Sequence, residues 1–226
     1  MAQQRLDKII ASTGRYSRRE VKTLVREGRV LVDGCIAASA EDKCDPLTAR
    51  ISVNGEELFY REHTYVMLHK PAGVLSATED GRGETVLDLL APEYRKIGLF
   101  PVGRLDKDTE GLLLLTDDGA LAHDLLAPKK HVDKVYFVRT DGALDDADCK
   151  AFEQGITLGD GLECLPAKLE ILKSDAQSEA LITIREGKFH QIKRMLASRG
   201  KPVVYLKRLS MGSLTLDEGL SKGEYR

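Results

Sequence analysis

The stretch from Gly103 to Gly119, GRLDKDTEGLLLLTDDG, places a four-leucine run directly before an Asp-Asp-Gly turn. A short apolar run that ends at a turn is typical of a core strand. Arg104 and Asp106 lie just ahead of it, two residues apart. Strand alternation would put both side chains on one face. The pattern predicts a charged pair at the edge of a core strand, which either holds a turn with Thr109 or takes part in chemistry.

The rest of the chain after residue 60 alternates between strand and helix patterns. Strands are expected within residues 64–70, 98–106, 111–116, 133–140, 166–173, 179–186 and 202–212. Helices are expected near Val86–Leu90 and within residues 119–128, 145–155 and 188–200. Strands predominate and turns join many of them, which favours an α+β fold with a mostly antiparallel sheet.

The first 59 residues have the pattern of a separate small domain. RLDKIIAST has helical spacing, and a second helix is predicted to begin after Ser17, with Glu20 completing a capping box and Gly28 ending it. Strands are expected in RVLVDG and ARISVNGEEL, each beside a turn. We therefore expect one domain over residues 1–59 and a second over 60–226.

Basic residues gather in two regions of a chain whose net charge is −2. Residues 1–30 hold eight Lys and Arg against three acids, and residues 185–208 hold eight against one. Two basic regions on an otherwise acidic chain favour nucleic-acid binding over solvated helix faces. The candidates for phosphate contacts are Arg15, Arg18, Arg19, Lys22, Arg185, Lys188, Arg194 and Arg208.

Several protein classes lack their sequence signatures here. No apolar run is long enough for a membrane span, and the N-terminus lacks the apolar core of a signal peptide. The four cysteines are widely spaced, which argues against zinc and favours reduced thiols in a cytoplasmic protein. The five histidines show no metal spacing and are assigned surface or packing roles. No nucleotide loop or nucleophile elbow is present, and DKDTE misses the aspartyl-phosphatase pattern by one place.

The chain closely resembles the RsuA/RluB family of ribosomal RNA pseudouridine synthases. The resemblance rests on GRLDKDTEGLLLLTDDG, MLHKPAGVLSAT, DKVYFV and REGKFHQIKRML, which occur in the family's order. The N-terminal segment resembles the RNA-binding domain of ribosomal protein S4. The resemblance implies an S4-like domain before a catalytic domain, and the family's members usually extend some residues beyond the closing GEYR.

Carried over residue by residue, the resemblance implies that Asp106 is the catalytic aspartate and Lys193 its basic partner. Arg104 would enter the RNA helix as the target uridine leaves it. Tyr136 would pack on the flipped base and is a candidate for proton removal. Phe189 and Met195 are predicted to be core residues rather than base-stacking ones.

Isomerising uridine to pseudouridine breaks the bond from ribose to N1 and forms a bond to C5, with loss of the C5 proton. The reaction imports no group and needs neither cofactor nor metal. The segment Gly155–Leu172 is more similar to family members that modify 16S RNA than to those that modify 23S RNA. We therefore expect a monomer that modifies a uridine of 16S ribosomal RNA. The alternatives are a 23S enzyme of the same family and a non-catalytic RNA-binding assembly factor.

Overall fold

The computed structural model describes residues 3–226, and within them the chain divides into two compact units. The first unit extends to Thr64 and includes the later segment Leu90–Phe100, and the second consists of Tyr65–Leu89 and Pro101–Arg226. The sequence predicted a single cut between residues 59 and 60. The structure groups residues 90–100 with the first unit, because their helix contacts the helix Leu6–Ser12 although it lies far along the chain.

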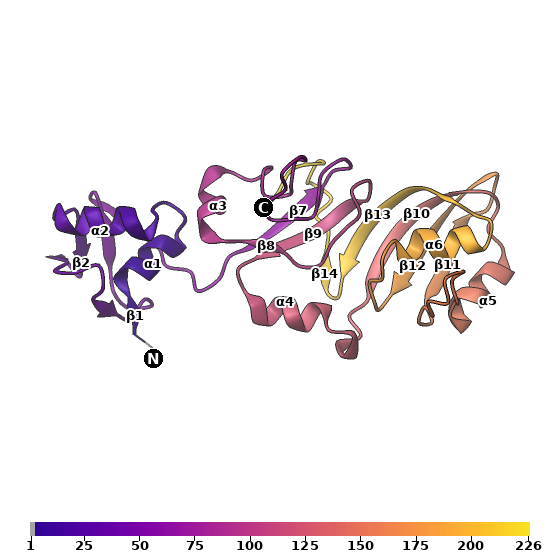
Figure 1. The fold of residues 1–226 in the computed structure, drawn as a ribbon, viewed down its shortest axis with the longest axis horizontal. Coiled ribbons are helices and arrows are strands. Elements are labelled where there is room, and N and C mark those ends of the chain that lie inside the picture. Colours follow the sequence, from indigo (N-terminus) through magenta and orange to yellow (C-terminus); the bar gives the residue numbers. More distant parts are fainter. Residues whose placement is uncertain (1–2) are drawn as a thin grey trace. The chain divides into compact units, whose positions relative to one another are not determined.

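Within the described residues, three helices and six short strands belong to the first unit. Figure 1 labels α1, α2, α3, β1 and β2 among them. The helices are α1 (Leu6–Ser12), α2 (Arg18–Arg26) and α3 (Pro92–Ile97). The strands are β1 (Gln4–Arg5), β2 (Val30–Val32), β3 (Cys35–Ile36), β4 (Lys43–Cys44), β5 (Ile51–Val53) and β6 (Glu56–Leu58). Strands β3, β2, β5 and β6 form an antiparallel sheet in that order, and β1 pairs with β4. Asn54 and Gly55 have positive φ angles in the tight turn between β5 and β6 that the sequence predicted.

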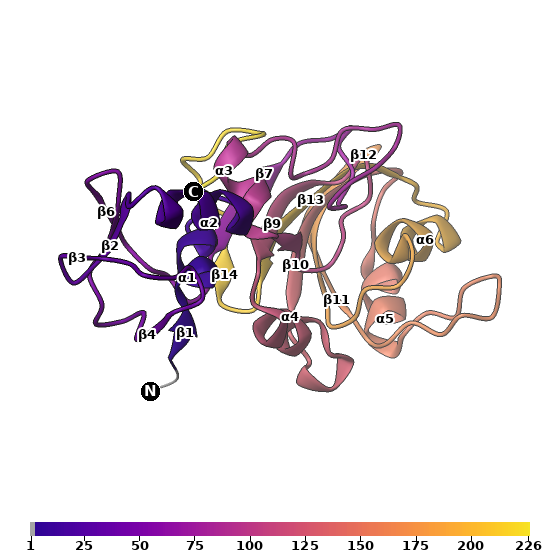
Figure 2. The same cartoon turned by 60° about the vertical axis from the view of Figure 1, so that its left-hand side comes forward.

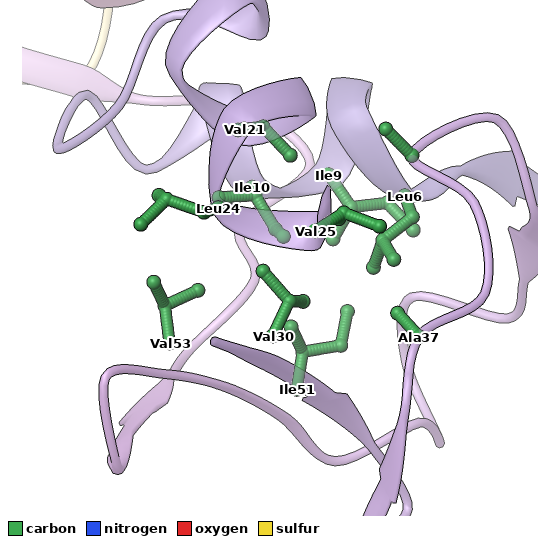
Figure 3. Close-up of a cluster of buried hydrophobic side chains, with 11 residues drawn as sticks. Leu6, Ile9, Ile10, Val21, Leu24, Val25, Val30, Ala37, Ile51 and Val53 are labelled. Carbon is green, nitrogen blue, oxygen red and sulfur yellow. The ribbon is translucent and has the colours of Figure 1, made fainter. Parts of the chain in front are cut away.

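The core of the first unit lies between its two leading helices and its sheet (Figure 3). Leu6, Ile9 and Ile10 come from α1, and they pack with Val21, Leu24 and Val25 from α2. Val30, Ile51 and Val53 close the cluster from the sheet. This burial leaves the charged side of α2 exposed to solvent.

The predicted capping box at the start of α2 is present. The Ser17 side chain accepts a hydrogen bond from the Glu20 N–H, and the Glu20 carboxylate accepts one from the Ser17 N–H at 2.6 Å. We expect Ser17→Ala to destabilise the first unit by about 1 kcal/mol, because the helix loses one satisfied end group. Urea unfolding of the full chain would show this as an earlier transition. Thr23→Ala, in the interior of the same helix, is the control and should not move that transition to lower urea.

The second unit is built on one eight-stranded sheet. Its strands are β7 (Tyr65–Lys70), β8 (Phe100–Pro101), β9 (Glu110–Thr116), β10 (Lys134–Asp141), β11 (Lys168–Lys173), β12 (Gln177–Ile184), β13 (Val203–Met211) and β14 (Leu214–Thr215). The order is β11-β12-β10-β13-β9-β7, while β8 and β14 pair with β9 and β13. Every residue of β9 is buried, as the four-leucine run predicted.

The sheet is mostly antiparallel, as the sequence predicted, and β13 with β9 is the parallel pair. Gly111 makes this pairing possible. A Cβ at this position would lie 2.2 Å from the Arg208 carbonyl oxygen, and the glycine has a φ of +104°. The close approach brings β9 beside β13, and with it the loop that precedes β9.

Four helical segments accompany this sheet: α4 (Gly119–Leu126), the 3-10 turn η1 (Pro128–Lys130), α5 (Asp146–Gln154) and α6 (Gln191–Ser198). Helices α5 and α6 lie on the same side of strands β10 to β12 (Figure 2). The helix predicted near Val86–Leu90 is wrong, because the segment forms turns in which Asp88 accepts hydrogen bonds from Thr85. Within residues 3–226, no helix has the length and apolar character needed to cross a membrane.

Candidate active site

Arg104 and Asp106 lie in the loop between β8 and β9, not on a strand as the sequence predicted. The reason is that the backbone of Leu105 bonds to a side chain instead of a neighbouring strand. The Ser76 hydroxyl accepts from the Leu105 N–H at 3.1 Å and donates to its carbonyl at 2.9 Å. The predicted alternation of exposure still holds, since Leu105 is buried between exposed Arg104 and half-buried Asp106.

Lys70, at the end of β7, hydrogen-bonds to the backbone of this loop. Its Nζ lies 3.1 Å from the carbonyl oxygen of Asp106, 3.2 Å from that of Lys107 and 2.9 Å from that of Thr109. The side chain is fully buried, and burial lowers the pKa of Lys70 to about 8. Sequence reasoning gave this residue no role, although a lysine at the end of an apolar strand was a usable signal.

The Asp106 carboxylate faces Lys193 on α6. The Lys193 Nζ lies 2.9 Å from Oδ2 of Asp106 and 2.5 Å from Oδ1 of Asp108. Partial burial lowers the pKa of Lys193, but the hydrogen bonds to the two carboxylates outweigh it and raise that pKa overall. The hydrogen bond from Lys193 also lowers the pKa of Asp108. The structure thus brings together the predicted pair of Asp106 and Lys193 and adds a second carboxylate.

The alternative in which Asp106 only caps a turn with Thr109 is not what the side chains do. The Thr109 N–H donates to the backbone carbonyl of Asp106 at 3.1 Å, while the Thr109 hydroxyl is buried without a partner. The Asp106 carboxylate points to Lys193 instead. The turn is therefore formed by backbone hydrogen bonds, and the Asp106 carboxylate takes no part in it.

Tyr136 and Arg104 line the same pocket as Asp106 and Lys193. The full lining is Arg104, Leu105, Asp106, Thr109, Tyr136, Ile184, Gly187, Lys188, His190, Gln191, Ile192, Lys193 and Leu206. Tyr136 comes from β10 and is 7% exposed. In the described part of the chain, no group hydrogen-bonds to the Tyr136 hydroxyl or the Arg104 guanidinium. Both side chains are available to a ligand.

His190 is a pocket residue that sequence reasoning assigned only a surface or packing role. Its Nε2 lies 3.6 Å from Oδ1 of Asp106, whereas Lys193 contacts the other carboxylate oxygen, Oδ2. Phe189, predicted to be in the core, is 74% exposed and stacks on the His190 ring. The prediction for Phe189 was wrong because α6 begins at Gln191, later than its sequence pattern indicated. Met195 is fully buried, as predicted.

The eight candidates for phosphate contacts have different surroundings. Those of the first unit, Arg15, Arg18, Arg19 and Lys22, are all exposed. In the second unit Arg185, Lys188 and Arg194 are accessible, and each pairs with an acid, Asp133, Glu186 and Asp160 respectively.

Arg208 is a correction to the predicted set. It is 2% exposed, and its Nε donates to the Leu112 carbonyl at 2.8 Å. The pairing of β13 with β9 at Gly111 brings Arg208 beside Leu112, to whose carbonyl the side chain bonds. Arg208 therefore has no surface from which to contact a phosphate.

Comparison with known proteins identifies the family of the chain. The family model described as RNA pseudouridylate synthase matches residues 64–198, and the S4 domain model matches residues 4–46. The chain belongs to the RNA pseudouridylate synthase family. It is thus an RNA pseudouridine synthase, an isomerase, with an S4 domain at its N-terminus. The resemblance seen in the sequence is confirmed.

Individual relatives of this synthase cover almost its full length. The uncharacterised RNA pseudouridine synthase YtzG of Bacillus subtilis is 51% identical over 98% of this chain and 93% of its own. The ribosomal small subunit pseudouridine synthase A of Vibrio cholerae is 40% identical over 98% and 94%. The ribosomal large subunit pseudouridine synthase B of Bacillus subtilis is 38% identical over 99% and 91%. A crystal structure of a pseudouridylate synthase matches 100% of this chain and 95% of its own, with 36% identity and a TM-score of 0.68.

No group of three or more His, Cys, Asp or Glu side chains among residues 3–226 is arranged to hold a metal ion. The cysteines Cys35, Cys44, Cys149 and Cys164 are all free thiols. The functional groups that line the pocket include the carboxylate, ammonium, imidazole, phenol and guanidinium described above.

Removing the cation of the pocket is expected to slow the synthase. Lys193→Met leaves Asp106 and Asp108 without their shared partner, and a hydrogen bond to a charged group is worth about 1.5–3 kcal/mol. Tritium release from RNA labelled at uracil C5 should fall by about 10- to 100-fold, and the pKa of Asp108 should rise toward its ordinary value. Lys193→Arg keeps the charge and should retain more activity. Equal rates for Lys193→Met and the unaltered enzyme would contradict this role.

Proposed function

We propose that this synthase isomerises a specific uridine of 16S ribosomal RNA to pseudouridine, with Asp106 as the catalytic carboxylate. The observation that carries the proposal is the pocket in which Asp106 faces Lys193 while Tyr136 and Arg104 remain unpartnered within the described chain. A carboxylate can act as a nucleophile or a base, and the Lys193 ammonium lies 2.9 Å from that of Asp106. The proposal gives these side chains the acid–base roles in the isomerisation.

The target uridine must leave the RNA stack before Asp106 can reach it, at a cost of a few kcal/mol. Tyr136 would hold the extruded ring, since stacking of a base on an aromatic side chain is worth about 1–3 kcal/mol. Arg104, exposed at the pocket and two residues from Asp106, would fill the vacated space in the RNA with a planar cation. Tyr136 would also be positioned to accept the C5 proton when the new bond has formed.

The two units would share the work of binding. Arg15, Arg18, Arg19 and Lys22 of the S4 domain would contact phosphates and provide affinity that does not depend on sequence. Arg185, Lys188 and Arg194 would hold the RNA backbone near the pocket. We propose that the enzyme acts as a cytoplasmic monomer on ribosomal RNA, either naked or in an assembling particle.

Two points support small-subunit RNA as the target. The resemblance of the segment Gly155–Leu172 to small-subunit members of the family implies it, and a relative that carries the small-subunit name is 40% identical. A relative named for the large subunit is 38% identical, so 23S RNA is the alternative target.

The Asp106 carboxylate also favours an enzyme over a non-catalytic RNA-binding protein. A carboxylate repels the phosphates of RNA, so a protein that only binds RNA would gain nothing from one at this place.

Tritium release tests the target. RNA labelled at uracil C5 would be offered as 16S RNA, 23S RNA and partly assembled particles of each subunit. Release from 16S RNA or its particles alone supports the proposal. Release from 23S RNA alone would show that the target uridine lies in the RNA of the large ribosomal subunit. Binding to these RNAs without release from any would instead indicate a non-catalytic RNA-binding protein.

A further inference from the structure

Phe189 is the most exposed aromatic side chain near the pocket, and its ring is held in a fixed place. It is 74% exposed, and its ring stacks on that of His190 with centroids 3.9 Å apart and planes 15° apart. One face of the Phe189 ring is therefore covered by the imidazole. The other face is turned away from the histidine.

The stack connects Phe189 to the catalytic carboxylate. His190 lines the pocket, and its Nε2 lies 3.6 Å from Oδ1 of Asp106. Phe189 thus stacks on a residue that itself approaches Asp106. A single exposed apolar side chain is common on protein surfaces, but one stacked against a pocket residue beside the reacting group has a defined position relative to the substrate.

The backbone around Phe189 is fixed on both sides. His190 has the left-handed conformation, with φ 48° and ψ 35°, which is uncommon for a residue with a side chain. The Lys188 N–H donates to the Gln191 side chain at 3.1 Å, and the Lys188 ammonium pairs with Glu186 at 3.0 Å. Left-handed residues of this kind persist where surrounding contacts enforce them, often at functional sites. The exposed ring is therefore displayed by a constrained turn.

Base flipping creates a need for such a ring. When the target uridine leaves the stack, the base next to it loses a stacking partner. Arg104 would fill the vacated space itself, and an aromatic face next to the pocket can restore part of the lost stacking. We propose that Phe189 stacks on the base of the nucleotide adjacent to the target uridine, with His190 supporting the ring from behind. This inference rests on the proposed function and adds a positioning contact for the neighbouring nucleotide.

The experiment uses the full chain and an RNA fragment around the modified uridine, located first by mapping the pseudouridine in the product. The base next to this uridine is replaced by 2-aminopurine, whose fluorescence is quenched by stacking. The variants are Phe189→Leu, which is apolar but not planar, and Phe189→Tyr, which keeps the ring. Phe59→Leu is the matched control, since Phe59 is 79% exposed and belongs to the first unit.

The unaltered enzyme, Phe189→Tyr and Phe59→Leu are expected to quench the 2-aminopurine, and Phe189→Leu is not. Phe189→Leu should also weaken RNA binding by about 5- to 150-fold, with a smaller change in the single-turnover rate at saturating enzyme. Full quenching and unchanged affinity in Phe189→Leu, with normal tritium release by the unaltered enzyme, would overturn this inference alone. Absence of tritium release by the unaltered enzyme would instead overturn the proposed function, and this inference with it.

Discussion

Asp106→Asn is expected to abolish tritium release from C5-labelled RNA while leaving RNA binding intact. The amide has nearly the shape of the carboxylate but cannot act as a nucleophile or accept a proton. Loss of a positioned acid–base group alone costs about 10²–10⁴-fold in rate, and loss of a covalent step would cost more. The measurement is the single-turnover rate of release, together with a binding isotherm on the same RNA.

Asp108→Asn is the matched control for this substitution. Asp108 is two residues away, also pairs with Lys193, and has a side chain that is 75% exposed. An exposed ion pair contributes about 0.2–1 kcal/mol, so the rate should fall less than about fivefold. If both variants lose activity equally, the chemistry does not depend on Asp106 in particular. If Asp106→Asn retains the full rate, its assigned role is wrong.

Lys70→Met is expected to lower both stability and activity although Lys70 does not line the pocket. The substitution removes a buried ammonium that donates to the carbonyls of Asp106, Lys107 and Thr109. Hydrogen bonds from a charged group are worth about 1.5–3 kcal/mol each, and the cost of burying the ammonium offsets part of their sum, so we expect the free energy of unfolding to fall by about 1.5–3 kcal/mol at neutral pH. A loop displaced by about 1 Å can cost about 10²-fold in rate. Thermal unfolding and tritium release measure the two effects.

Lys134→Met provides the comparison. Lys134 is also buried, but its Nζ donates to the Val132 carbonyl, outside the Asp106 loop. It should lose less activity than Lys70→Met for a similar change in stability. If the two variants lose activity in proportion to stability, Lys70 has no particular effect on the loop.

The pH dependence of stability gives a second test of Lys70. Its pKa in the fold is about 8, below the ordinary value of 10.5, so the folded state loses this proton first as pH rises. The unfolded state then binds more protons, and the free energy of unfolding rises with pH between about 8 and 10.5. At about 1.36 kcal/mol per pKa unit, the gain is about 3 kcal/mol relative to Lys70→Met. If the free energy of unfolding of the unaltered enzyme and of Lys70→Met changes equally with pH, Lys70 is not buried as a charged group.

Local signals in the sequence predicted the regular elements well. The capping box of Ser17 and Glu20 and the cap of α5 at Asp145 are both present, because their hydrogen bonds join residues three positions apart. The loop that contains Asp106 was predicted as a strand because its alternation is strand-like. Its conformation is set by Lys70 and Ser76, which lie about thirty residues away in the sequence and give no local sign of the contact.

The candidate site was only partly predictable for the same reason. The pairing of Asp106 with Lys193 followed from resemblance to a known family, and the structure places the two side chains in contact. Arg208 was assigned to the surface and Phe189 to the core, and both were wrong. Whether such residues are buried depends on the packing of β13 against β9 and on where α6 begins, neither of which composition or spacing reveals.

The most direct measurement is the pseudouridine content of ribosomal RNA after incubation with the purified chain, determined by nucleoside analysis under single-turnover conditions. One pseudouridine gained and one uridine lost per RNA are expected with the unaltered enzyme, and none with Asp106→Asn. Binding of every ribosomal RNA without any pseudouridine, or equal amounts from both proteins, would contradict the proposed function.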